Sequence, residues 1–288
     1  MASNMTRRVA FAAVAIPLAL LVVWSGGWPL ALLVATVAAL GARELVAIAE
    51  ASGNRPLRPN TVLLAGAVPL AVHAALAIPA AGDWFAEAWP YLVGVGMVLW
   101  LGELLWQRAP TERPLAAIGI SAFAVLYAAV LPAFLLGIRH GAFGVRSWAG
   151  TALVFFPLVV IWVCDTAAMF AGKAIGGPKL APVISPGKTR VGGVAGIVGG
   201  AAVAPLFALW LFPLAGIDLA LLPALLTALV LSVVGQLGDL AESLFKREAG
   251  VKDSSNLIPG HGGVLDRFDA LYVALPVAAL CYKLAGVM

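Results

Sequence analysis

Residues 150–172 read GTALVFFPLVVIWVCDTAAMFAG and form an apolar run with a single ionisable residue, Asp165. A helix needs about 20 mostly apolar residues to cross the hydrocarbon core of a bilayer. The run therefore predicts a transmembrane helix. An acid inside such a helix is costly and usually functional, so Asp165 is a candidate site residue that should face the helix bundle. The alternative is a structural hydrogen bond between helices.

Eight further apolar stretches predict spans of the same kind, although the first of them is short. They comprise residues 9–24, 29–48, 61–79, 90–106, 115–138, 191–212, 218–237 and 268–287. The composition agrees, because 62% of the residues are hydrophobic and 11% are charged, against about 25% charged in soluble domains. We predict an all-α, polytopic integral membrane protein with about nine transmembrane helices.

The chain divides into two predicted regions. Residues 1–148 hold about five spans, and residues 149–288 form a catalytic region with polar loops at 173–190 and 238–267. With the N-terminus in the cytoplasm, 15 of the 18 Lys and Arg residues fall on the inner side, as the positive-inside rule requires. The expected location is the inner (cytoplasmic) membrane, with both polar loops facing the cytoplasm, where nucleotides are found.

Paired acids stand at the ends of the last two predicted spans. Asp239 and Glu242 are three residues apart, as are Asp266 and Asp269, so each pair shares a helix face. Helix capping could explain one of the later pair. Oxygen ligands of this kind suit a hard cation, and Mg²⁺ is the natural choice beside phosphates. We predict that Asp239, Asp266 and Asp269 bind the metal.

The two polar loops are rich in glycine, hydroxyl groups and cations, which is the mixture that phosphate binding requires. The stretch Gly187-Lys188-Thr189 resembles the end of a P-loop, but Pro182 stands where that pattern needs glycine. A Walker A motif is therefore excluded. A purely topological loop would explain the lysines and arginines but not the density of Gly, Ser and Thr.

Residues 243–269 resemble the signature of the phosphatidate cytidylyltransferases, also called CDP-diacylglycerol synthases. The resemblance rests on SLFKR (243–247), KDSS (252–255) and IPGHGGVLDRFD (258–269), with DTAA (165–168), GK (172–173), KLAP (179–182) and SPGKT (185–189) upstream. It covers roughly residues 160–275. Met169 and Arg190-Val191 depart from the family pattern, which affects nucleotide contacts and not the reaction.

The resemblance implies that CTP and phosphatidic acid react to give CDP-diacylglycerol and pyrophosphate, a step of phospholipid biosynthesis in the lipid bilayer. It implies Mg²⁺, a second monovalent cation such as K⁺, and a homodimer; no nucleic acid partner is expected. The residues expected to be catalytic are Asp239, Asp266, Asp269, Lys246 and Arg267. Those expected to bind substrate are Asp165, Lys173, Lys179, Ser185, Lys188, Thr189, Arg190, Arg247, Lys252, Asp253 and His261.

Two other functions remain open. A CTP-dependent lipid kinase would share many of these features and is the closest alternative. A transporter would also carry acids inside the membrane, but it would leave the phosphate-type loops unexplained.

Overall fold

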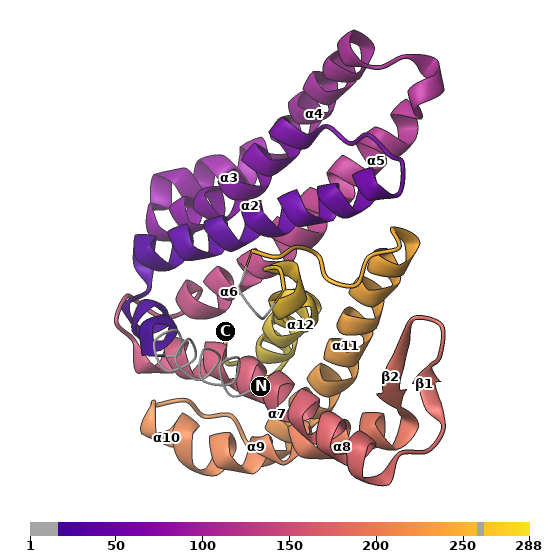
Figure 1. Cartoon of the computed structure of the whole chain (residues 1–288). Helices are drawn as coiled ribbons and strands as arrows, with labels where there is room; N and C mark the ends of the chain where they lie inside the picture. The colour runs from indigo at the N-terminus through magenta and orange to yellow at the C-terminus, as the bar shows by residue number, and fades with distance from the viewer. Residues whose placement is uncertain (1–16, 258–261) are drawn as a thin grey trace. The chain divides into compact units, whose positions relative to one another are not determined.

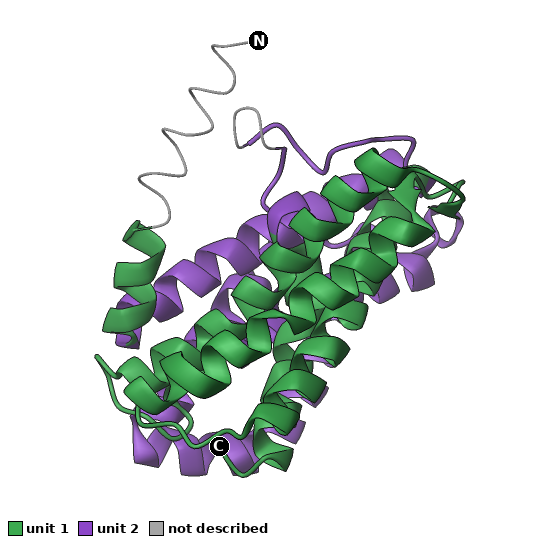
Figure 2. Ribbon diagram, turned by 90° about the horizontal axis from the view of Figure 1, so that it is seen from below, with its two compact units in different colours: residues 1–26, 138–247, 268–288 green, residues 27–137, 248–267 purple. Residues whose placement is uncertain are grey.

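The computed structural model describes residues 17–257 and 262–288 (Figure 1). It contains two compact units (Figure 2). Unit 1 comprises residues 1–26, 138–247 and 268–288, and unit 2 comprises residues 27–137 and 248–267. Within the described ranges the regular secondary structure is helical apart from one short hairpin, so the all-α prediction is confirmed. The units reflect contacts and do not test the predicted boundary at residue 148.

Unit 2 is helical and consists mainly of long apolar helices joined by short helical turns. They are α2 (Gly27–Ala51), α3 (Arg58–Ala77), α4 (Pro79–Gln107), η1 (Pro110–Glu112), α5 (Pro114–Val125), η2 (Leu126–Val130) and α6 (Leu131–His140), the last of which leads into unit 1. Pro79 and Pro114 open their helices, where the missing N–H of proline would have no partner in any case. Helices α2 and α3 lie side by side (Figure 1).

Unit 1 surrounds α7 (Trp148–Ile175), which is the apolar run with Asp165. The other elements are a helix over residues 17–25, β1 (Lys179–Ala181), β2 (Ser185–Thr189), α8 (Arg190–Ala201), α9 (Val203–Leu206), η3 (Phe207–Leu211), α10 (Phe212–Leu214), α11 (Leu221–Glu248) and α12 (Leu265–Leu284), which begins in unit 2. Ser147 caps α7 by accepting a bond from the Gly150 N–H at 3.3 Å.

Seven helices among the described residues are long and apolar enough to cross a membrane. They span residues 27–51, 58–77, 79–107, 114–140, 148–175, 190–214 and 221–248. The protein is therefore a polytopic membrane protein, but the count of about nine is not confirmed. Most of the first predicted span lies outside the described residues. The last corresponds to α12, which has 20 residues but carries Asp266, Arg267, Asp269 and Lys283.

Both predicted polar loops begin later than expected because the preceding helices continue. Helix α7 extends to Ile175, and the residues after it form the antiparallel hairpin β1–β2, in which Lys179 is opposite Thr189. Helix α11 continues to Glu248. An ion pair of 2.9 Å between Lys246 Nζ and Glu242 Oε2, one turn apart, supports this extension.

Glycines allow the helices of unit 1 to approach closely. Gly192, Gly196 and Gly200, spaced by four residues on α8, are buried and face α7: a Cβ at Gly196 would lie 3.0 Å from the Cys164 carbonyl oxygen. This is therefore a contact within the chain. On α11, a Cβ at Gly235 would collide with Ile161, and one at Gly238 would collide with Val273.

Arg139 is a fully buried cation in unit 1. Its Nε donates to the Val23 carbonyl at 2.7 Å, one terminal nitrogen donates to Trp24 at 2.7 Å, and the other to Gly144 at 2.9 Å. The carbonyls at the end of the helix over residues 17–25 have no partner within that helix. Arg139 therefore ties this helix end to the loop after α6.

Candidate functional site

Three helices of unit 1 bring acidic side chains together. Asp165 on α7 interacts electrostatically with Asp239 on α11 and with Asp269 on α12. Asp239 and Asp269 also interact with each other. Like charges gathered inside a helical bundle are unfavourable unless cations accompany them. We call Asp165, Asp239, Glu242 and Asp269 the acid cluster.

The hairpin supplies one of these cations. Lys188 Nζ lies 2.6 Å from Asp239 Oδ2, and both side chains are partly buried, at 26% and 30% exposed. Lys188 also interacts with Asp165. The Arg247 Nε–H donates to the Ile184 carbonyl at 3.1 Å, at the turn of the hairpin. These two contacts attach the hairpin to α11.

The hairpin also leads directly into α8. The Thr189 hydroxyl accepts a bond of 3.0 Å from the Gly192 N–H and so caps the helix. Lys179 and Arg190 are exposed beside it, Lys173 is exposed on α7, and Ser185 begins β2. The predicted substrate-binding residues of the first loop therefore gather around one small hairpin.

Glu242 is fully buried on α11. Its Oε2 accepts a bond from Lys246 Nζ at 2.9 Å, whereas its Oε1 is buried without a donor. The neighbouring acid is Asp269, which interacts closely with Glu242. Two adjacent carboxyl groups, one with an unsatisfied buried oxygen, need either a shared proton or a cation.

The acid cluster fits Mg²⁺ in donor chemistry, because it offers carboxylate oxygens alone. Among the described residues, no three His, Cys, Asp or Glu side chains already stand at ligating positions. Phosphate oxygens and water would therefore complete the coordination of an ion held by Asp239 and Asp269. The metal assignment of these two residues and of Asp266 stays a prediction.

In unit 2, Asp266 shapes the segment that precedes α12. Its Oδ2 accepts bonds from the Ser254 N–H at 2.9 Å and the Gly263 N–H at 2.8 Å. The Ser254 hydroxyl is also 2.9 Å from this oxygen. Asp266 thus ties Ser254 to Gly263 in addition to any role in catalysis.

The other predicted residues of this segment lie on its surface or outside the description. Lys252, Asp253 and Arg267 are exposed. His261 lies outside the described residues.

Glu44 is a buried acid beside this segment that the sequence analysis did not single out. It is 5% exposed on α2, and its carboxylate accepts bonds from Ser254, Ser255 and the N–H groups of Val264 and Leu265, where α12 begins. The available signal was an acid that interrupts the apolar stretch 29–48. That stretch predicts a transmembrane span, and no local pattern connects Glu44 with residues more than 200 positions away.

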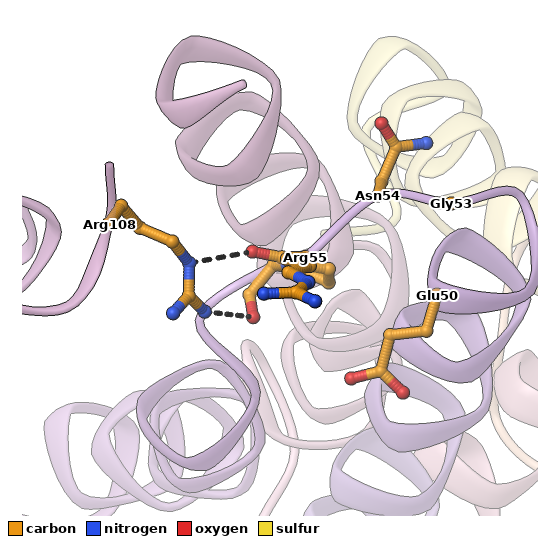
Figure 3. Close-up of a pocket in the computed structure, with 6 residues that line it drawn as sticks. Glu50, Gly53, Asn54, Arg55 and Arg108 are labelled. Atoms are coloured by element: carbon orange, nitrogen blue, oxygen red, sulfur yellow. Dashed lines mark hydrogen bonds between the residues drawn. The ribbon is translucent and has the colours of Figure 1, made fainter. Parts of the chain in front are cut away.

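A separate pocket of unit 2, of about 570 Å³, is lined by Glu50, Gly53, Asn54, Arg55, Pro56 and Arg108 (Figure 3). Arg108 Nε donates to the Arg55 carbonyl at 3.3 Å. Arg55 itself pairs with Glu112, and Arg58 with Glu50 at 2.6 Å. These arginines are engaged in holding the connection between α2 and α3.

These features define a polytopic membrane protein with clustered acids beside a cationic hairpin, an arrangement suited to phosphate chemistry. The chain belongs to the cytidylyltransferase family, whose model matches residues 6–285. The resemblance inferred from residues 160–275 is thereby confirmed and extended over nearly the whole chain.

Individual proteins similar to this chain carry the name of the same family. The chain is 47% identical over 127 residues to the phosphatidate cytidylyltransferase of Bacillus subtilis (strain 168), a match covering 44% of this chain and 46% of the relative. It is 46% identical over 145 residues to that of Brucella suis, covering 48% of each. It is 42% identical over 153 residues to the phosphatidate cytidylyltransferase of Pseudomonas aeruginosa, a match covering 53% of this chain and 55% of the relative. These matches span about half the length of each relative.

Proposed function

We propose that the protein is a phosphatidate cytidylyltransferase, which transfers CMP from CTP to phosphatidic acid. The observation that carries the proposal is the acid cluster of unit 1 with Lys188 bound to Asp239. The names of the relatives support it, since all three described above are phosphatidate cytidylyltransferases.

In the proposed reaction, a phosphate oxygen of phosphatidic acid attacks the α-phosphorus of CTP. A new P–O bond forms, the bond to the β-phosphate oxygen breaks, and pyrophosphate leaves. The attacking phosphate is already an anion near neutral pH, so no strong general base is needed. Such transfers depend mainly on positioning and on charge neutralisation.

The residues of unit 1 have distinct proposed roles. Asp239 and Asp269 would hold Mg²⁺, which when bound neutralises phosphate charge. Lys188 and Arg247 would keep the hairpin against α11 and present cations to the triphosphate. Asp165 would orient Lys188 within the bundle.

The site belongs at a membrane surface because one substrate is a lipid and the other is soluble. We place the protein in the inner membrane, with its N-terminus and active site facing the cytoplasm, in keeping with the positive-inside rule. A homodimer and a second monovalent cation such as K⁺ are further proposals, which rest on the family resemblance.

The deciding assay supplies labelled CTP and phosphatidic acid to the purified protein in detergent with Mg²⁺. Formation of CDP-diacylglycerol and pyrophosphate supports the proposal. Release of CDP with a phosphorylated lipid would identify a lipid kinase instead, and the absence of any lipid product would favour transport.

Asp239→Asn tests the role of the acid cluster. It preserves side-chain volume but removes the charge that pairs with Lys188. Asp218→Asn is the matched control, because Asp218 is exposed between α10 and α11. We expect at least a hundredfold loss of kcat/KM for Asp239→Asn alone; equal activity of the two variants would contradict the assignment.

Asp266→Ala is expected to abolish turnover. Because Asp266 also ties Ser254 to Gly263, the variant must first be shown to be folded. A folded variant with near-normal activity would contradict the prediction that Asp266 is a metal ligand.

A further inference from the structure

Helix α2 carries a buried carboxylate whose hydrogen bonds all reach one distant segment. Glu44 Oε1 accepts from the Ser255 hydroxyl at 2.6 Å and from the Val264 N–H at 3.0 Å. Glu44 Oε2 accepts from the Leu265 N–H at 2.7 Å. All of these residues belong to unit 2. A buried charge is tolerated only when donors compensate it, and here the compensating donors are Ser255, Val264 and Leu265.

The Ser254 hydroxyl links Glu44 to Asp266. Its Oγ lies 2.9 Å from Glu44 Oε2 and 2.9 Å from Asp266 Oδ2. A hydroxyl has one proton, so it donates to one of the two carboxylates at a time. Both carboxylates therefore compete for the hydroxyl of Ser254, and a shift of Glu44 would be transmitted through this hydroxyl to Asp266.

Glu44 also acts at the beginning of α12. Val264 and Leu265 stand at the start of that helix, where N–H groups have no intrahelical acceptors. A carboxylate at this end is favoured by the helix dipole as well. Glu44 thus caps α12 from another helix and orients its first turn, which contains Asp266.

The glycines before α12 fit this arrangement. Gly262 has a φ of +82°, in the left-handed region that favours glycine. A Cβ on Gly263 would lie 2.5 Å from Glu44 Oε2. The backbone approaches the carboxylate so closely that only glycine leaves room.

We propose that Glu44 is a positioning residue for cytidylyl transfer: its bonds to Ser254, Ser255 and the start of α12 hold the first turn of that helix so that Asp266 is ready for the nucleotide. This inference rests on the proposed function. Glu44 does not contact the reacting atoms in this role; it acts through the backbone that carries Asp266.

The decisive variant is Glu44→Gln, which keeps the shape of the side chain. Each carboxylate oxygen accepts a backbone N–H, one from Val264 and one from Leu265. In either orientation of glutamine, its NH₂ group would face one of these N–H donors, and backbone donors cannot rotate away. At least one bond must be lost. The matched control is Glu50→Gln on the same helix, because Glu50 forms an exposed pair with Arg58.

Two measurements are made on each purified full-length variant in detergent. Hydrogen exchange of the amides of residues 262–266 measures directly how firmly the hydrogen bonds of Glu44 hold the start of α12, and it does not depend on activity. Loss of a charge-assisted bond should speed this exchange by roughly 10- to 100-fold. Steady-state kinetics should show a KM for CTP raised by about tenfold, since a merely structural defect would reduce the active fraction and leave KM unchanged.

Unchanged exchange in Glu44→Gln, or faster exchange with an unchanged KM for CTP, would overturn the inference. If the wild-type protein forms no CDP-diacylglycerol, the proposed function fails. The exchange rate of Glu44→Gln then tests by itself whether Glu44 holds the start of α12: faster exchange supports this contact, and unchanged exchange contradicts it. If Glu44→Gln does not fold, Ser255→Ala replaces it. That variant removes one donor to Glu44 and keeps the charge, and it should speed exchange by about threefold or more.

Discussion

Replacing Lys188 with methionine should leave a folded protein that has lost most of its activity. The change keeps the length of the side chain and removes its charge. In the structure the ammonium group lies 2.6 Å from Asp239 Oδ2, with the two side chains 26% and 30% exposed. For a pair that still reaches solvent, we expect a loss of only about 1 kcal/mol in unfolding free energy. The corresponding fall in Tm is about 2–4 °C.

The effect on catalysis should be larger, because Lys188 is a cation among acids. Without it, Asp165, Asp239 and Asp269 would repel the triphosphate. Loss of one preorganised charge contact in an active site typically lowers the rate by about 10²–10³-fold. This is equivalent to about 2.7–4 kcal/mol of transition-state stabilisation.

The assay compares kcat/KM for CTP with Tm in the same detergent, using Lys283→Met as the control. Lys283 is exposed at the end of α12, so its variant should match the wild type in both measurements. If Lys188→Met retained more than a third of the wild-type kcat/KM, the lysine would not neutralise substrate charge. A fall in Tm well beyond 4 °C would show that we had mistaken a structural residue for a functional one.

Three further predictions follow from the described contacts. Arg139→Lys keeps the charge but cannot reproduce three carbonyl contacts, so it should lower the free energy of unfolding by about 2–4 kcal/mol. Thermal unfolding checks this, with Arg146→Lys at an exposed position as the control. Equal Tm values for the two variants would refute the prediction. Gly263→Ala should destabilise by about 1–3 kcal/mol because of the close approach of Glu44. Gly102→Ala, which meets nothing within 4 Å, should be neutral or slightly stabilising in the same unfolding assay. Chelation of Mg²⁺ should stop formation of CDP-diacylglycerol and its return should restore it, whereas turnover in metal-free buffer would contradict the proposed metal.

Local patterns predicted the helices correctly. The apolar run 150–172 predicted α7. Polar groups are costly in lipid, so a helix that crosses the bilayer must consist of a long run of apolar residues, which is easily recognised in a sequence. Asp165 and Asp239 could be singled out for the same reason. That they interact follows from the packing of α7 and α11, which the sequence suggests only through family resemblance.

Other features depend on contacts between distant residues. The capping of α12 by Glu44 joins positions 44 and 265, and neither position has a local pattern that indicates the other. The count of about nine spans is not confirmed, because α12 carries four charged residues and does not qualify on composition, and most of the first predicted span lies outside the described residues. The hairpin was missed because β1 and β2 have three and five residues, too few for a clear alternation of apolar and polar side chains.

The close glycine contacts of α11 should be detectable in a deep mutational scan as positions that tolerate almost no substitution. Gly235 and Gly238 face neighbouring helices with no room for a Cβ, whereas Val233 and Leu237 are 43% and 59% exposed. Tolerance to substitution should therefore rise and fall with the turn of the helix, with apolar replacements accepted at 233 and 237 and almost none at 235 and 238. Since Asp239 follows directly, these two glycines determine the depth and rotation at which the carboxylate is presented, and variants that leave Asp239 intact could still misalign it.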